Sequence, residues 1–146
     1  MLELHLVGGG TRLIDPELVM ALATTTKLAK GRGRSTTVYY ISESLGADVL
    51  EEYALSRSGL PHLFRAPDVR ESYVTLKAQL PHLVELQFLD GRPVAINPTK
   101  LGPVYLWNDG TVIVRLVSRH GFQVRGTLEA VAEALGTRSS SHASSA

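Results

Sequence analysis

One segment occurs twice in this sequence. Residues 1–22 align with residues 83–104 without a gap, five of the 22 positions are identical, and seven others exchange one apolar residue for another. The identical positions of the first copy are Glu3, Leu4, Gly9, Ile14 and Pro16. Because glycine and proline restrict where a chain can turn, their recurrence in register predicts that both copies follow the same path.

Both copies have the pattern of a β-hairpin. Apolar residues alternate along 2–6 and 84–88, which is typical of a strand with one buried face. A glycine-containing turn follows each strand, at 8–10 and at 90–91, where glycine accepts a positive φ. We expect the return strand of each copy to end at the repeated isoleucine, just before the repeated proline.

Beyond these hairpins the second copy continues with recognisable elements. The turn sequence Asn-Asp-Gly at 108–110 predicts a further hairpin, and residues 121–124 predict another short strand. Thr127 is placed to cap a helix that Gly136 ends. The second copy is therefore expected to contain five short strands followed by one helix.

The first copy has matching strands at 19–24 and 36–41, joined by a longer and basic connection. Residues 44–58 predict an extra helix, inserted before the closing helix of this copy. Asp68 is predicted to open that closing helix, and Glu71, three residues later, completes a capping box. The apolar stripe of the closing helix is predicted to be Val69, Tyr73, Leu76 and Leu80.

The predicted fold class is α+β, with two tandem small antiparallel β modules, each ending in an α-helix, packed together. The first module covers residues 1–81 and includes the basic loop and the extra helix. The second module covers residues 82–137, and a Ser-rich tail follows at 138–146. Small sheets leave exposed edges, so we expect the chain to form a homo-oligomer that covers them.

Composition limits the classes of function. The chain has 15 basic and 14 acidic side chains, a balance that disfavours a general binder of polyanions. There are no cysteines, and the five histidines lack the paired spacing of a metal site, so we expect neither a metal nor another cofactor. The N-terminus has no basic signal region, and no apolar run approaches the roughly 20 residues of a membrane span. We therefore expect a cytoplasmic protein with no membrane partner.

Arginines supply the candidate groups for an anionic ligand. The loop 27–34 combines glycines, which free the backbone, with arginines that can hold a phosphate through two parallel N–H bonds. The alternative for this loop is a solvated connection without a ligand. Arginines at 115, 119 and 125 lie with His120 around one turn of the second copy, and with Arg92 they form either a second basic patch or an ordinary charged surface.

Aromatic side chains supply candidate stacking groups. Tyr39 and Tyr40 point to opposite faces of one strand, so one ring is expected to be exposed and able to stack on a base. Phe88 is either a further stacking ring or part of the core. The predicted ligand-binding residues are Arg32, Arg34, Tyr39, Phe88, Asn97, Arg115, Arg119 and Arg125.

Residues 84–98 contain an Asp-Gly-Arg-Pro turn followed by Asn-Pro, and the hairpin at 109–110 and residues 128–131 come after it. At these positions the second copy resembles the FlbD-like and SwrD-like small proteins of flagellar and swarming motility. Those proteins resemble one copy, whereas this chain has two, and residues 125–127 replace the family's Glu-Ser before the last helix. The resemblance implies a motility accessory.

The duplicated, loop-elaborated chain also resembles, in size and style, phage anti-defence proteins that sequester cyclic nucleotide signals. That resemblance implies a non-enzymatic protein that binds a small anionic ligand, a cyclic nucleotide, in the host cytoplasm. The sequence has no nucleophile-elbow pattern, which agrees with binding without turnover. The alternatives are a structural or interaction protein, such as a virion component or motility accessory, and a nucleic-acid-binding regulator that uses the basic loop.

Overall fold

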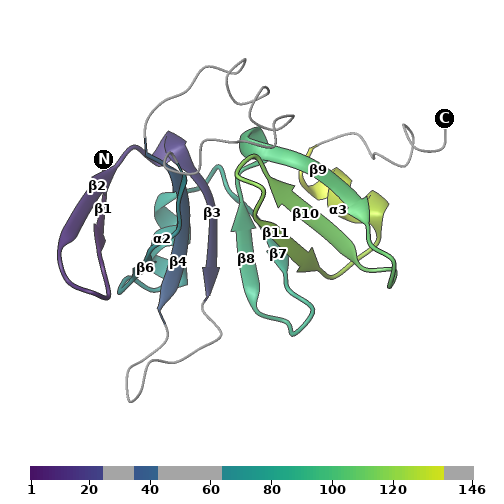
Figure 1. Ribbon diagram of the computed structural model, residues 1–146, viewed down its shortest axis with the longest axis horizontal. Coiled ribbons are helices and arrows are strands. Elements are labelled where there is room, and N and C mark those ends of the chain that lie inside the picture. The colour runs from purple at the N-terminus through teal and green to yellow at the C-terminus, as the bar shows by residue number, and fades with distance from the viewer. Residues whose placement is uncertain (25–34, 43–63, 137–146) are drawn as a thin grey trace.

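The computed structural model describes residues 1–24, 35–42 and 64–136. Within these ranges the protein is rich in β-structure, with three antiparallel sheets and two short α-helices, so its fold class is α+β (Figure 1). The predicted extra helix at 44–58, the basic loop at 27–34 and the Ser-rich tail lie outside the described residues.

The N-terminal elements begin with a hairpin and a single turn of 3-10 helix. They are β1 (Leu2–His5), β2 (Thr11–Ile14), η1 (Pro16–Leu18), β3 (Val19–Thr24) and β4 (Thr36–Ile41). Two very short strands and a helix follow, namely β5 (Phe64–Arg65), β6 (Asp68–Val69) and α2 (Tyr73–Gln79). The strands predicted at 19–24 and 36–41 are confirmed. β3 is an apolar run that the sheet buries, whereas buried and half-buried residues alternate along most of β4.

The C-terminal elements follow the same order. They are β7 (Val84–Gln87), β8 (Pro93–Ile96), η3 (Pro98–Lys100), β9 (Leu101–Leu106), β10 (Val112–Leu116), β11 (Gly121–Val124) and α3 (Leu128–Ala134). The hydroxyl of Thr127 accepts a hydrogen bond from the Ala130 amide, as a helix N-cap does, and Gly136 follows the helix with a φ of +70°. The predicted cap and stop of this helix are therefore confirmed.

The bounds of β1, β2, η1 and β3 recur 82 residues later as those of β7, β8, η3 and β9. The pairing register recurs too, because Leu2 lies opposite Ile14 and Val84 lies opposite Ile96. β3 and β9 also carry an irregularity at corresponding points of their pairing with the next strand. The two hairpins thus have the same backbone plan.

Strands β3 and β8 join the two parts of the chain. β3 pairs with β4 on one edge and with β8 on the other, and the two meet in the middle of the molecule (Figure 1). The side-chain amide of Asn97 donates to the carbonyl of Val19 across this junction, at 2.8 Å. Single bridges, from Leu6 to Val69 and from Phe88 to Val124, link the neighbouring sheets at their margins.

Two hydrophobic clusters form the core, one on each face of β3. Val19 and Leu22 belong to the cluster that includes helix α2, and Met20 and Ala21 belong to the cluster that includes helix α3. Because both faces of β3 are covered, its sequence is a continuous apolar run rather than an alternating one. Burial on both sides makes β3 the centre of the structure.

The predicted start of the closing helix of the first part is wrong. Asp68 and Val69 form β6, which pairs with β4, and α2 begins only at Tyr73 with Ser72 as its N-cap. Glu71 does not complete a capping box, because its carboxylate accepts hydrogen bonds from the backbone amide and the ring of His5. The pattern of neighbouring residues could not predict the bond between Glu71 and His5, because the two residues are 66 positions apart in the sequence. The buried positions Tyr73, Leu76 and Leu80 were predicted correctly.

Candidate functional site

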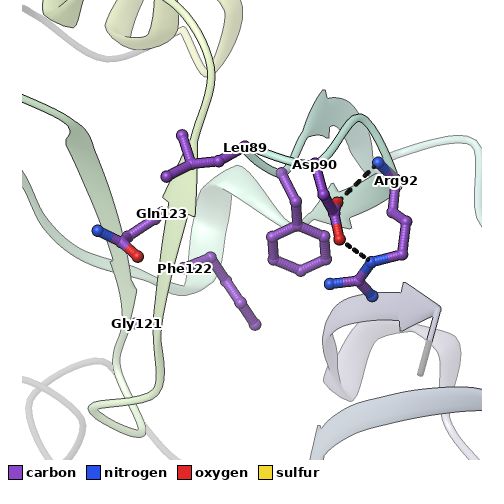
Figure 2. Close-up of a pocket in the computed structure, with 7 residues that line it drawn as sticks. Leu89, Asp90, Arg92, Gly121, Phe122 and Gln123 are labelled. Atoms are coloured by element: carbon purple, nitrogen blue, oxygen red, sulfur yellow. Dashed lines mark hydrogen bonds and ion pairs between the residues drawn. The ribbon is translucent and has the colours of Figure 1, made fainter. Parts of the chain in front are cut away.

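A pocket of 310 Å³ lies where the turn between β7 and β8 meets β11. Figure 2 shows the turn on one side, with Asp90 and Arg92, and Phe122 and Gln123 of β11 on the other. The residues that line it are Phe88, Leu89, Asp90, Arg92, Gly121, Phe122 and Gln123. This pocket combines aromatic rings with a cation, so it is the candidate functional site.

The turn itself holds Asp90 and Arg92 in place. The amide of Phe88 donates to the carbonyl of Arg92 at 2.8 Å, and Gly91 takes a φ of +91° that other residues rarely adopt. The Asp90 carboxylate accepts hydrogen bonds from the Arg92 amide and, at 2.7 Å, from its Nε atom. These hydrogen bonds lower the pKa of Asp90, so its carboxylate is charged at neutral pH.

The guanidinium of Arg92 lies over the ring of Phe88, with 4.5 Å between the guanidinium carbon and the ring centroid. Its terminal nitrogen also donates to the carbonyl of Thr24, at the end of β3. Arg92 is thus held from both parts of the chain, and only 23% of its side chain is exposed. A guanidinium fixed in this way loses little further freedom when it pairs with an anion.

A row of four rings leads away from Arg92, through the buried Phe122 and the half-buried Tyr39 to His120 at the surface. Phe88 and Phe122 contact each other edge to face, with centroids 5.8 Å apart. Tyr39 contacts Phe122 at 5.2 Å and His120 at 4.9 Å, again edge to face. Tyr39 belongs to β4 and the other three rings to the C-terminal elements, so both parts of the chain build the row.

Partial burial sets the ionisation of Tyr39 and His120, the two rings farthest from Arg92. It lowers the pKa of His120, whose Nδ1 lies 2.7 Å from the Ser118 hydroxyl, so the imidazole is neutral near neutral pH. Burial, with the charge of Asp68, also raises the pKa of Tyr39, which keeps its phenol protonated. The row is therefore uncharged, and the charges of the site lie at the turn.

The arrangement can bind a ligand that is both planar and anionic. Aromatic side chains at the mouth offer a surface for a flat ring, and Arg92 offers N–H donors for a phosphate. Asp90 opposes a second negative charge close to Arg92. This charge pattern favours a singly charged phosphate group over a polyphosphate.

The structure places two of the predicted ligand residues at this site and a third beside it. Phe88 lines the pocket, and Tyr39 lies in the aromatic row. Arg125 lies behind the turn, where its Nε donates to the carbonyl of Leu89 at 3.1 Å and its guanidinium packs against Gly91. Arg125 therefore supports the turn from the side.

The remaining predicted residues lie elsewhere. Asn97 is buried, and its side chain already bonds Val19 and caps η3 through Thr99. Arg115 pairs in register with Gly121, so it shares the face opposite Phe122 and lies over the ring of Tyr105 at 5.8 Å. Its Nε is buried without a hydrogen-bond partner.

Arg119 occupies the turn between β10 and β11 with a φ of 73°, next to His120. Arg32 and Arg34 lie outside the described residues. Sequence reasoning missed Phe122 and treated Arg92 and His120 only as basic groups. The signal for Arg92 was its position two residues after Asp90 in a glycine turn, which favours the observed hydrogen bonds.

Comparison with family models, with curated proteins and with solved structures finds no match for this chain. The resemblance to motility proteins therefore stays a prediction. None of the helices that the structure describes is long and apolar enough to cross a membrane. In the same part of the chain, no three histidine or carboxylate side chains gather where a metal ion could be held.

Proposed function

We propose that this chain is a non-enzymatic binding protein made of two tandem copies of one β-rich module, residues 1–81 and 82–137. The recurrence of element bounds and of hairpin register supports the duplication. The helices support it as well, because Ser72 and Thr127 cap helices of seven residues at the same point of each unit. The candidate pocket lies in the second module, and the first module supports it through the carbonyl of Thr24, which accepts a hydrogen bond from Arg92.

The proposed ligand is a small cyclic nucleotide, sequestered without turnover in the manner of a phage-type sponge. The observation that carries this proposal is the pocket in which Arg92 covers the ring of Phe88 at the end of an aromatic row. A base would stack against the rings at the mouth of the pocket, and the phosphate would pair with Arg92. Arg125 would hold the turn in position from behind.

Isothermal titration of the full chain with cyclic mononucleotides and dinucleotides tests this proposal. Binding with micromolar affinity or better is expected for at least one of them, and Arg92→Gln is expected to weaken it about tenfold or more, because a hydrogen bond to a charged group is lost. Arg70→Gln is the matched control, since Arg70 is an exposed arginine of the first module, away from the pocket. Absence of heat with every nucleotide would remove the cyclic nucleotide from consideration.

The second candidate function is that of an interaction protein, as in a virion or a motility apparatus. Several large apolar side chains are exposed, among them Leu13 on β2 and Trp107 after β9. Exposed apolar surface of this kind favours an interaction protein. Size-exclusion chromatography separates the two functions, because a binder forms a discrete species whereas a structural component assembles further or needs a partner. A nucleic-acid regulator that uses the basic loop would instead shift labelled DNA or RNA in a salt-dependent way.

A further inference from the structure

Strand β2 lies at the outer end of its sheet. On the far side of β1, the carbonyl of His5 accepts a hydrogen bond from the Arg70 amide at 2.8 Å, so β1 has neighbours on both of its edges. Among the strands that the structure describes, β2 pairs with β1 alone, and Figure 1 shows it at the side of the molecule opposite β9. The outer edge of β2 therefore offers backbone N–H and C=O groups to a further strand.

Leu13 presents these backbone groups in the middle of the edge. The Leu6 amide donates to the carbonyl of Gly10, the residue opposite it, at 3.0 Å. Because bonded and non-bonded pairs alternate along an antiparallel ladder, Leu4 and Arg12 also form a bonded pair, whereas Leu13 in the next pair does not bond to β1. Leu13 therefore turns its N–H and C=O toward the outer edge.

The second hairpin shows that an edge of this kind accepts an antiparallel strand. Ala95 is the counterpart of Leu13, and it lies opposite Leu22 of β3 at the junction between the two parts. There Ala95 is 0% exposed, whereas Leu13 is 60% exposed. The shared backbone plan thus leaves a larger apolar side chain in water at the edge of β2, where a further strand would cover it.

The sequence of β2 limits how the strand can pair with a second copy of itself. Antiparallel pairing of two identical strands has a two-fold axis, which can lie at any of the four residues of β2. An axis at Arg12 brings two guanidinium groups side by side, and like charges at facing positions repel. An axis at either end of the strand sets Leu13 opposite Gly9 or Asp15, neither of which offers an apolar side chain. The axis at Leu13 is the favourable one.

We propose that β2 is the interface of a two-fold symmetric homodimer, in which Leu13 of one chain lies opposite Leu13 of the second copy. The two leucines exchange backbone hydrogen bonds, and their side chains pack together on one face of the sheet. Arg12 lies opposite Ile14 of the second copy, and Thr11 lies opposite Asp15. Such a contact is closed, because each chain uses this edge once. The proposal is independent of the nucleotide ligand, since none of these residues lines the pocket.

Backbone hydrogen bonds also close the two ends of this contact. The amide of Asn97, the counterpart of Asp15, donates to the carbonyl of Met20 on β3 at 2.8 Å. Asp15 has an extended backbone, with a φ of −73° and a ψ of 124°, so its amide points to the outer edge of β2 in the same way. In the dimer this amide donates to the carbonyl of Thr11 of the second copy. Because strands of four residues bury little surface, the dimer is expected to be weak and reversible.

Disulfide cross-linking tests the register, and the chain has no native cysteine to give a background. Leu13→Cys is expected to form a disulfide-linked dimer under mild oxidation, because the Cα atoms of a bonded pair lie about 5.5 Å apart, within the range of a disulfide. Thr11→Cys is the matched control on the same face of the same strand, since its two copies would lie four residues, or about 13 Å, apart. About tenfold more dimer is expected from Leu13→Cys than from Thr11→Cys. Equal yields would reject the proposal.

Sedimentation velocity of the full chain over a range of concentrations tests the dimer itself. Wild-type protein is expected to show a reversible monomer–dimer equilibrium, and Leu13→Lys to weaken it about tenfold or more, because two lysines would face each other at the axis. Val74→Lys is the matched control, since Val74 is also an exposed apolar residue, 76% exposed on α2. A wild-type chain that stays monomeric up to about 1 mM would overturn the proposal, as would a dimer that Leu13→Lys leaves unchanged.

Two charge variants of Thr11 are expected to act in opposite directions. Thr11→Lys sets an ammonium group opposite the Asp15 carboxylate of the second copy, twice in each dimer, and is expected to strengthen dimerisation about threefold. Thr11→Glu sets two carboxylates opposite each other and is expected to weaken dimerisation by a similar factor. Effects of the same sign would contradict the register. A monomeric chain that binds nucleotide would overturn this inference and leave the binding function standing, and a dimer without nucleotide binding would do the reverse.

Discussion

The hairpins at residues 2–14 and 84–96 have one backbone plan and two different surroundings. In the first, β2 lies at the outer end of its sheet, whereas in the second, β8 is covered by β3. Leu13 is consequently exposed and its counterpart Ala95 fully buried. The comparison shows that the neighbours of a strand in its sheet, rather than its local sequence pattern, decide which of its side chains are buried.

The turns of the two hairpins differ in chemistry and share part of their backbone path, although Gly10 takes a positive φ that its counterpart Arg92 does not. Gly9 and Gly91 have φ values of +103° and +91°, and both turns are closed by the same backbone hydrogen bonds. The first turn carries glycine where the second carries Asp90 and Arg92. Of these two turns, only the second therefore carries the side chains that form the candidate site.

The largest expected effect comes from the buried strand of each hairpin. Leu4→Ala is expected to lower the free energy of unfolding by about 2–5 kcal/mol, since Leu4 is fully buried beside α2. Leu86→Ala, at the matching position, is expected to cost about 1–2 kcal/mol, because that side chain is only partly buried. Urea unfolding of both variants measures the difference, and equal losses would break the comparison.

A smaller difference in the loss of stability is expected between Asp15 and Asn97, the residues that precede η1 and η3. Asn97→Ala leaves the buried carbonyl of Val19 without its partner and removes the cap of η3, which costs about 1–3 kcal/mol. Asp15→Ala removes only an exposed cap and is expected to cost about 0.5–1 kcal/mol. Thermal unfolding at low protein concentration, where association does not contribute, provides the measurement. A larger loss at Asp15 would contradict the assignment of the junction.

The smallest expected effect on stability comes from the protonation of two histidines, His5 in the N-terminal part and His120 in the C-terminal part. The hydrogen bond to Glu71 raises the pKa of His5 above 6.5, whereas burial lowers the pKa of His120 below it. Stability from charged His5 is therefore present below pH 6.5 and lost as the pH rises through the raised pKa. At His120 the fold loses stability as the pH falls from 6.5 to the lowered pKa, because the unfolded chain then binds the proton more readily. NMR titration should find the two rings on opposite sides of 6.5, and Glu71→Gln should return His5 alone to its ordinary value. Titration of both on the same side would refute this assignment.

Much of the fold followed from local signals. The alternation along 2–6 and 84–88, the glycine turns and the caps at Thr127 and Gly136 predicted elements that the structure contains. These features depend on residues within a few positions of one another. The alternation along β4 also predicted that Tyr39 and Tyr40 differ in exposure, and Tyr39 is half-buried whereas Tyr40 is buried.

Sequence reasoning failed where distant residues decide the outcome. Glu71 bonds to His5 across 66 positions of sequence, which replaced the expected capping box and moved the start of α2. Asn97 was expected at the ligand, but its amide holds a strand that precedes it by 78 positions. The contact of Phe122 with Tyr39 depends in the same way on pairing between the two parts.

The pairing of β3 with β8 also governs when the protein can fold. β3 is the centre of the structure, yet one of its two neighbours is encoded after α2. During translation the N-terminal part therefore emerges with a central apolar strand uncovered on one edge, and it stays so until the later hairpin leaves the ribosome. Long-range pairing of this kind slows folding, and an apolar strand edge that waits for its partner favours aggregation.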